Sequence, residues 1–140
     1  MKQWMVYAFI SMFFAGFTAV IAKHGLTGIS AELGLTIRTL FVCGFILFFA
    51  AVFVPTADLQ HLKSMNYFWL GISGATTALS WIFYYKALKD GSVATVALID
   101  KGSVVVAMLM AGWLLKEVIT PRMVAGAGSI LFGLLIIAKK

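Results

Sequence analysis

Three ionisable residues stand inside long apolar stretches of this sequence, and their types could serve solute or proton binding. Arg38 lies about two helical turns into one stretch, and Asp100 and Lys101 lie about two turns into another. Charged groups inside a membrane are costly and usually face a cavity or a partner, which makes them functional candidates. Asp100 could take up a proton or a cationic substrate group. Adjacent helical residues do not face each other, so Arg38 is the predicted partner of Asp100.

This predicted pair has two interpretations, which the residues alone leave open. It could be a structural ion pair that locks two helices together, or it could lie on a path for solutes. Glu32 is the fourth charged residue of the apolar stretches. It stands nearer a stretch end, so we expect it to be solvated.

A stripe of polar residues follows one face of another apolar stretch. Ser73, Thr77, Ser80 and Tyr84 recur at spacings of four, three and four, which places them on one side of a helix. Such hydroxyl residues commonly pack helices together in membranes. Tyr84 is too large for a packing notch, so we favour a pathway role, with Trp81 beside the stripe able to stack against a ligand.

Small residues gather near the end of the chain and let helix backbones approach closely. We predict that they serve helix packing or dimer contact and do not touch substrate. They are Ala107, Ala111, Ala125, Gly126, Ser129 and Gly133.

These residues require apolar helices to position them. Hydrophobic residues make up 62% of the 140 residues and charged residues 11%, where roughly 25% charged is usual for soluble domains. Within lipid every backbone polar group must be satisfied internally, so the apolar stretches are predicted to be helices. The sequence predicts one all-α integral membrane domain over residues 1–140. Its five transmembrane helices are expected at residues 4–22, 32–54, 66–85, 93–115 and 123–138.

Several other classes of protein are not indicated. The net charge is +6, but the basic residues are scattered and form no patch for nucleic acid. Cys43 is the single cysteine, and His24 and His61 stand far apart, so no metal site is expected. No nucleophile or phosphate-binding motif is present, so we expect neither an enzyme nor a cofactor.

The basic residues that would orient the helices are nearly balanced across the membrane. With five spans, one side carries Lys2, Lys63, Lys116 and Arg122, and the other carries Lys23, Lys86, Lys89, Lys139 and Lys140. Orientation normally follows an asymmetry of Lys and Arg. Either other cues orient the chain, or copies insert both ways and pair as an antiparallel homodimer that supplies the missing inverted repeat.

The second half of the chain resembles the EamA domain of the drug/metabolite transporter superfamily. The resemblance is greatest to the branch with a single five-helix domain, in which an Asp-Lys pair occupies the fourth helix. Residues that carry it are Ser73-Gly74, Thr77, Leu79-Ser80-Trp81, Tyr84-Tyr85-Lys86-Ala87-Leu88, Gly91, Asp100-Lys101, Ser103-Val104-Val105, Leu115, Glu117 and Gly126. The first half matches loosely, through Ala22-Lys23 and Arg38.

Two departures from the family pattern bear on the fourth helix. Lys116 stands where the family usually has glycine, so a tight turn there is less favoured. Two-domain relatives often carry a proline near the position of Asp100. This chain has none there, so their unwound backbone is not expected to carry over.

The resemblance implies a secondary transporter, an exporter or permease of small organic metabolites or drugs. It would work by alternating access in an antiparallel homodimer within the lipid bilayer of a bacterial or archaeal cytoplasmic (inner) membrane. Arg38, Asp100 and Lys101 would supply charge, Ser80, Trp81 and Tyr84 the wall, and Asp100 any proton coupling. The alternative is a non-transporting membrane subunit or assembly factor, in which the polar groups serve packing only.

Overall fold

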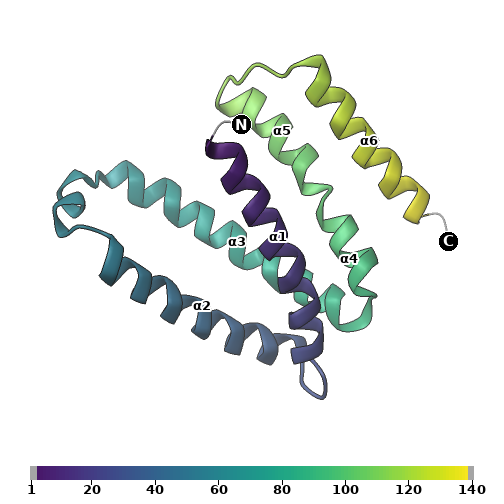
Figure 1. The fold of residues 1–140 in the computed structure, drawn as a ribbon, viewed down its shortest axis with the longest axis horizontal. Coiled ribbons are helices and arrows are strands. Elements are labelled where there is room, and N and C mark those ends of the chain that lie inside the picture. Colours follow the sequence, from purple (N-terminus) through teal and green to yellow (C-terminus); the bar gives the residue numbers. More distant parts are fainter. Residues whose placement is uncertain (1–2, 139–140) are drawn as a thin grey trace. The chain divides into compact units, whose positions relative to one another are not determined.

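The computed structural model describes residues 3–138, and every regular element in this range is a helix (Figure 1). Contacts group the chain into two compact units. Unit 1 comprises Met1–Ala19 and Gly91–Lys140, and unit 2 comprises Val20–Asp90. The elements are α1 (Gln3–Gly25), α2 (Ala31–Phe53), the 3-10 helix η1 (Thr56–His61), α3 (Ser64–Asp90), α4 (Val93–Asp100), α5 (Ser103–Leu114) and α6 (Pro121–Ala138).

Three segments of the described chain are long and apolar enough to cross a membrane. They are α1, α2 and the 22-residue run Val93–Leu114, while the apolar run of α6, Pro121–Ile137, is shorter. α3 has 27 residues, but its many hydroxyl groups lower its hydropathy, and it is not among the three. The length and composition of the helices support an all-α membrane protein, and the count of five spans stays a prediction.

Hydroxyl side chains fix where several helices begin. Ser30 and Ser92 lie just before α2 and α4 and accept hydrogen bonds from the backbone N–H groups of Leu33 (3.2 Å) and Thr95 (3.3 Å). Thr120 does the same for Met123 at the start of α6. Each cap satisfies one of the N–H groups that a helix start leaves without an internal partner. The serine and threonine residues between the apolar stretches therefore set the helix starts.

Unit 2 is built around the contact of α2 with α3. These helices run antiparallel and are joined by the segment that contains η1 (Figure 1). Leu88 is fully buried, and Leu26, Ala31 and Tyr85 are nearly so. Gly34 of α2 lies directly against the Leu26 side chain, where a Cβ atom would overlap it. The buried residues of unit 2 lie near the ends of α2 and α3 that are remote from η1.

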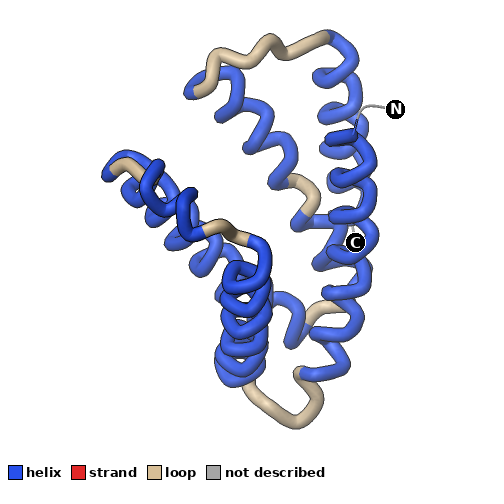
Figure 2. The backbone as a smooth tube through the Cα atoms, turned by 60° about the vertical axis from the view of Figure 1, so that its left-hand side comes forward, coloured by secondary structure: helices blue, strands red, loops and turns tan. Residues whose placement is uncertain are grey.

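A short turn interrupts the fourth predicted span just after Asp100, in unit 1. α4 ends at Asp100 and α5 begins at Ser103, and the two-residue turn between them keeps its backbone angles in the right-handed helical region (Figure 2). The N–H groups of Lys101 and Gly102 bind the carbonyls of Leu98 and Ile99, only three residues back. The backbone therefore tightens and breaks its α-helical ladder here without a proline.

Very little of the described chain is buried. Its buried residues are Ala19, Leu26, Ala31, Tyr85, Leu88 and Ala127. Large apolar side chains face outward along the helices, as Phe45 (71% exposed) and Trp113 (75%) do. Apolar surface on this scale marks contact with lipid or with another protein chain.

Candidate functional site

The Arg38 guanidinium lies near two aromatic rings of α3. Its guanidinium carbon lies 4.3 Å from the ring centroid of Trp81 and 5.8 Å from that of Tyr85. Trp81 and Tyr85 are four residues apart, so they lie on one face of α3. A guanidinium over an aromatic face is attracted by the ring quadrupole, by about 1–2 kcal/mol where water is scarce. This arrangement holds the cation between two helices.

One nitrogen of the guanidinium nevertheless has no hydrogen-bond acceptor among the described residues. Its Nη1 atom is buried and has no hydrogen-bond partner among the described residues. A buried donor without an acceptor costs about 1–3 kcal/mol. Such a donor in a native structure calls for an explanation, and one explanation is a ligand that is not part of the chain.

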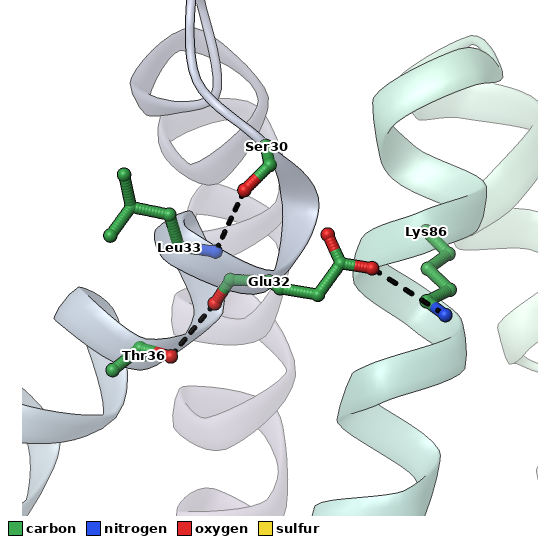
Figure 3. A network of polar contacts seen from close by, with 5 residues as sticks. All are labelled: Ser30, Glu32, Leu33, Thr36 and Lys86. Atoms are coloured by element: carbon green, nitrogen blue, oxygen red, sulfur yellow. Dashed lines mark hydrogen bonds and ion pairs between the residues drawn. The ribbon is translucent and has the colours of Figure 1, made fainter.

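The acidic residues of unit 2 lie away from this guanidinium along the helices. Glu32 is one of them, and its carboxylate lies 3.5 Å from the Lys86 ammonium (Figure 3). Both side chains are more than half exposed, so the pair adds little stability. Figure 3 also shows the Ser30 cap on Leu33 and the Thr36 hydroxyl, which donates to the Glu32 carbonyl at 2.8 Å. The expectation that Glu32 is solvated agrees with this exposure.

Two lysines tie the ends of α1 and α3 together. The Lys23 ammonium donates to the carbonyls of Leu88 (2.6 Å) and Lys89 (2.8 Å) at the end of α3. The Lys89 ammonium donates to the carbonyls of Leu26 (3.0 Å) and Ile29 (2.7 Å) just after α1. Carbonyls at a helix end lack internal partners and attract cations. Each lysine thus caps the segment that carries the other.

The predicted polar stripe lies on α3, with its residues in different surroundings. Ser73, Thr77 and Ser80 are exposed, and the Thr77 hydroxyl donates to the Ser73 carbonyl at 2.8 Å. Trp81 and Tyr84 are half-buried. Trp81 stacks on Arg38, whereas the sequence suggested a ligand as its partner. The stripe residues are on one helix as expected, and their role in a pathway stays a prediction.

Asp100 and Lys101 lie at the break between α4 and α5. Asp100 is the half-buried last residue of α4, and Lys101 is exposed in the link. No side-chain hydrogen bond or ion pair is recorded for either within residues 3–138. Arg38 belongs to unit 2 and Asp100 to unit 1, so their pairing stays a prediction.

Most of the small residues predicted for packing are on the surface of the single chain. Ala125, Gly126 and Ser129 of α6 are exposed, and a Cβ atom at Gly126 would meet nothing. Ala107 of α5 is exposed too, while Ala111 and Gly133 are half-buried. Ala127, which the sequence did not single out, is the buried residue of α6. The exposed members remain candidates for contact with a second chain.

Sequence reasoning missed Tyr85 and the two capping lysines. The predicted site does not include Tyr85, although its spacing of four from Trp81 indicates that both share a face. Lys23 and Lys89 were counted only as loop charges. Their contacts depend on how α1 and α3 meet, and no local pattern carries that information. Within residues 3–138 no group of three His, Cys, Asp or Glu residues could hold a metal ion.

Apolar helices with few buried residues indicate a membrane protein whose chain crosses the bilayer more than once. The EamA-like transporter family matches residues 2–139, and the chain belongs to this family. It is 32% identical over 140 residues to a protein of Sinorhizobium sp named "Uncharacterized transporter in cobO 3'region". That match covers 98% of this chain and 97% of the relative. No solved structure matches the chain. Family membership supports a membrane transporter of the drug/metabolite superfamily.

Proposed function

We propose that this protein is a secondary transporter, an exporter or permease of small organic metabolites or drugs. The observation that carries the proposal is the helix break at Asp100–Ser103 in a chain of the EamA-like transporter family. Secondary transporters commonly bind solutes and coupling ions where a membrane helix is interrupted, because the interruption frees backbone groups and brings helix ends to the site. Here the break places a carboxylate and an ammonium group at such a point.

Each polar or aromatic residue predicted for the pathway has a proposed role in transport. Asp100 carries a proton if transport is proton-coupled, and Lys101 supplies charge beside it. Arg38 supplies charge on α2, and Ser80, Trp81 and Tyr84 form a wall on α3, with Ser73 and Thr77 further along the same face. Hydroxyl and aromatic groups suit small amphipathic solutes, because they offer hydrogen bonds and apolar contact together.

The proposal includes an antiparallel homodimer in a bacterial or archaeal cytoplasmic membrane. Many secondary transporters are built from two inverted halves with the substrate between them. One copy of this chain would supply one half. The exposed surface of α6 around Gly126 and Ser129, with Ala107 of α5, is the proposed dimer contact.

Flux through proteoliposomes tests the proposed function. Purified protein is reconstituted and assayed with labelled amino acids, organic acids and quaternary ammonium compounds, both under a pH gradient and in solute exchange. Asp100→Asn should abolish gradient-driven accumulation while the dimer stays intact on size exclusion, since an amide cannot take up a proton. Asp90→Asn is the matched control, because Asp90 is an exposed acid at the end of α3, and it should leave flux unchanged.

The outcomes separate transport from the alternative of a non-transporting subunit or assembly factor. Absence of flux for every compound in the wild type would overturn the transport proposal. Equal gradient-driven flux in the wild type and in Asp100→Asn would retain transport and remove Asp100 as the coupling group.

A further inference from the structure

We propose that Arg38 binds the carboxylate of the transported solute, which makes small organic anions the substrate class of this protein. The inference rests on the proposed transport function. It is carried by three features of unit 2, namely the stacked guanidinium, its buried donor without an acceptor, and the placement of the acidic residues.

The aromatic contacts do not use the hydrogen-bond donors of the guanidinium. Trp81 and Tyr85 contact Arg38 through their ring systems, at 4.3 Å and 5.8 Å from the guanidinium carbon. The five N–H donors of arginine lie in the plane of the group, so an aromatic ring over its face does not consume them. The ring contacts therefore hold the guanidinium against α3 without using its donors, which suit a planar, two-oxygen acceptor such as a carboxylate.

The chain supplies no recorded acceptor for the Nη1 donor. This atom is buried and lacks a hydrogen-bond partner within the described residues. The Arg38 side chain as a whole remains partly exposed, so a small solute can reach the group. An acceptor that arrives with the solute would remove the cost of the unmet donor, and that relief adds to the affinity for an anion.

The acidic residues of unit 2 are placed where they do not neutralise this cation. Glu32 precedes Arg38 by six residues, about 9 Å along the helix axis, and pairs with Lys86. Asp90 lies at the exposed end of α3, and Asp58 lies in η1. The positive charge of Arg38 is therefore not compensated within unit 2.

Another source of the same oxyanion chemistry is the phosphate of a lipid headgroup. Arg38 follows the start of α2 by seven residues, about 10 Å, and a long side chain can extend from such a depth towards the membrane surface. The stack on Trp81 argues for a solute, since it holds the guanidinium against α3. A lipid competitor in the experiment separates the two sources.

Fluorescence of Trp81 provides a direct readout of binding. The substitutions Trp4→Phe, Trp69→Phe and Trp113→Phe leave Trp81 as the only tryptophan, next to the guanidinium. This protein, in non-ionic detergent, is titrated with benzoate, benzamide and benzamidine, which share a ring and differ in charge. Benzoate should give a saturable change at concentrations at least tenfold lower than benzamide or benzamidine.

Variants of the arginine identify the group that binds. Arg38→Gln should weaken benzoate binding tenfold or more, with size exclusion and helix content unchanged. Arg38→Lys keeps the positive charge but cannot form a bidentate pair with a carboxylate, so this variant should bind benzoate with intermediate affinity. An equal response to all three compounds, a preference for benzamidine, no response to any of them, or a benzoate response that survives Arg38→Gln would overturn the proposal.

Two further measurements distinguish a solute from a lipid ligand and anion transport from binding without transport. Displacement of benzoate by an equal concentration of short-chain phosphatidylglycerol would overturn the assignment to a solute, and failure to displace it supports a solute site. Labelled benzoate and benzamidine are then compared in proteoliposome flux. Flux of benzamidine without benzoate would overturn the inference and retain transport, whereas benzoate binding without flux of any solute would retain the site and overturn transport.

Discussion

At the scale of single residues, the position that departs from the family pattern carries an unusual backbone conformation. Lys116 follows the end of α5 with φ of 53°, in the left-handed region. The backbone N–H of the next residue, Glu117, donates a hydrogen bond of 3.2 Å to the Ala111 carbonyl and so caps the end of α5. Glycine adopts this conformation without the clash that a Cβ atom causes. The tight turn is therefore present, although lysine replaces the glycine that the family usually has there.

We expect Lys116→Gly to raise the free energy of unfolding by about 1 kcal/mol. Left-handed backbone costs a non-glycine residue about 1–2 kcal/mol, partly offset by the greater freedom of glycine in the unfolded chain. Thermal unfolding in detergent measures this as a higher midpoint. Glu117→Gly is the matched control and should lower the midpoint. A lower midpoint for Lys116→Gly would contradict the assigned strain.

The reciprocal caps of Lys23 and Lys89 should contribute to stability through charged hydrogen bonds. Replacing either lysine by methionine keeps the aliphatic stem and removes the donor. The free energy of unfolding should fall by about 2 kcal/mol for each, since hydrogen bonds to charged groups are worth roughly 1.5–3 kcal/mol. Lys86→Met is the control, because Lys86 forms only an exposed ion pair, and it should unfold nearly as the wild type does. Equal thermal midpoints for the two cap variants and the Lys86→Met control would show that the caps do not stabilise the fold.

At the scale of elements, helix type and approximate position could be predicted from the sequence, whereas helix contacts could not. Apolar runs and capping serines indicate where α2 and α4 begin, because both signals are local. The partner of Arg38 depends on the register of α2 against α3, and no pattern within one helix encodes that register. The turn after Asp100 could not be predicted, because no proline marks it in the sequence. It is formed by backbone hydrogen bonds around Gly102 that join residues three positions apart.

The close approach of Gly34 to Leu26 gives a prediction for the α2–α3 unit. Gly34→Ala should lower the free energy of unfolding by about 1–3 kcal/mol, because the added methyl group overlaps a buried side chain. Gly44→Ala in the same helix meets nothing within 4 Å and should raise it by up to about 1 kcal/mol, since alanine is the better helix former. Thermal unfolding of both variants tests the contact, and equal shifts in one direction would contradict it.

At the scale of the whole molecule, the near balance of basic residues remains the feature that no local structure explains. Lys23 and Lys89 donate to backbone carbonyls, and both belong to the count of basic residues that bears on orientation. Lys2, Lys139 and Lys140 complete the count and lie outside the described residues. Four basic residues against five give the membrane insertion machinery almost no asymmetry to follow. Balanced insertion would supply both orientations that an antiparallel dimer needs.

Balanced insertion can be tested with single cysteines in a Cys43→Ser background. One cysteine replaces Thr27, which precedes α2, and the other replaces Gln60, which follows α2. We expect each cysteine to be labelled from both sides of the membrane. Both positions are exposed, so an impermeant maleimide can reach them. Each should react in right-side-out and in inside-out vesicles, with roughly half of the copies labelled in each, because the lysine balance favours neither orientation. Labelling of each position from one side alone would contradict dual insertion.

The same balance predicts how added charge should affect transport. Two extra lysines beside Gln60 should drive most copies into one orientation, and two beside Thr27 should drive them into the other. Each variant alone should lose most solute flux, because parallel copies cannot form the inverted pair. Co-expression of the two should restore flux, since together they again supply both orientations. Full flux from either variant alone would show that transport does not require antiparallel pairing, and a failure of co-expression to rescue would place the defect in the added lysines themselves.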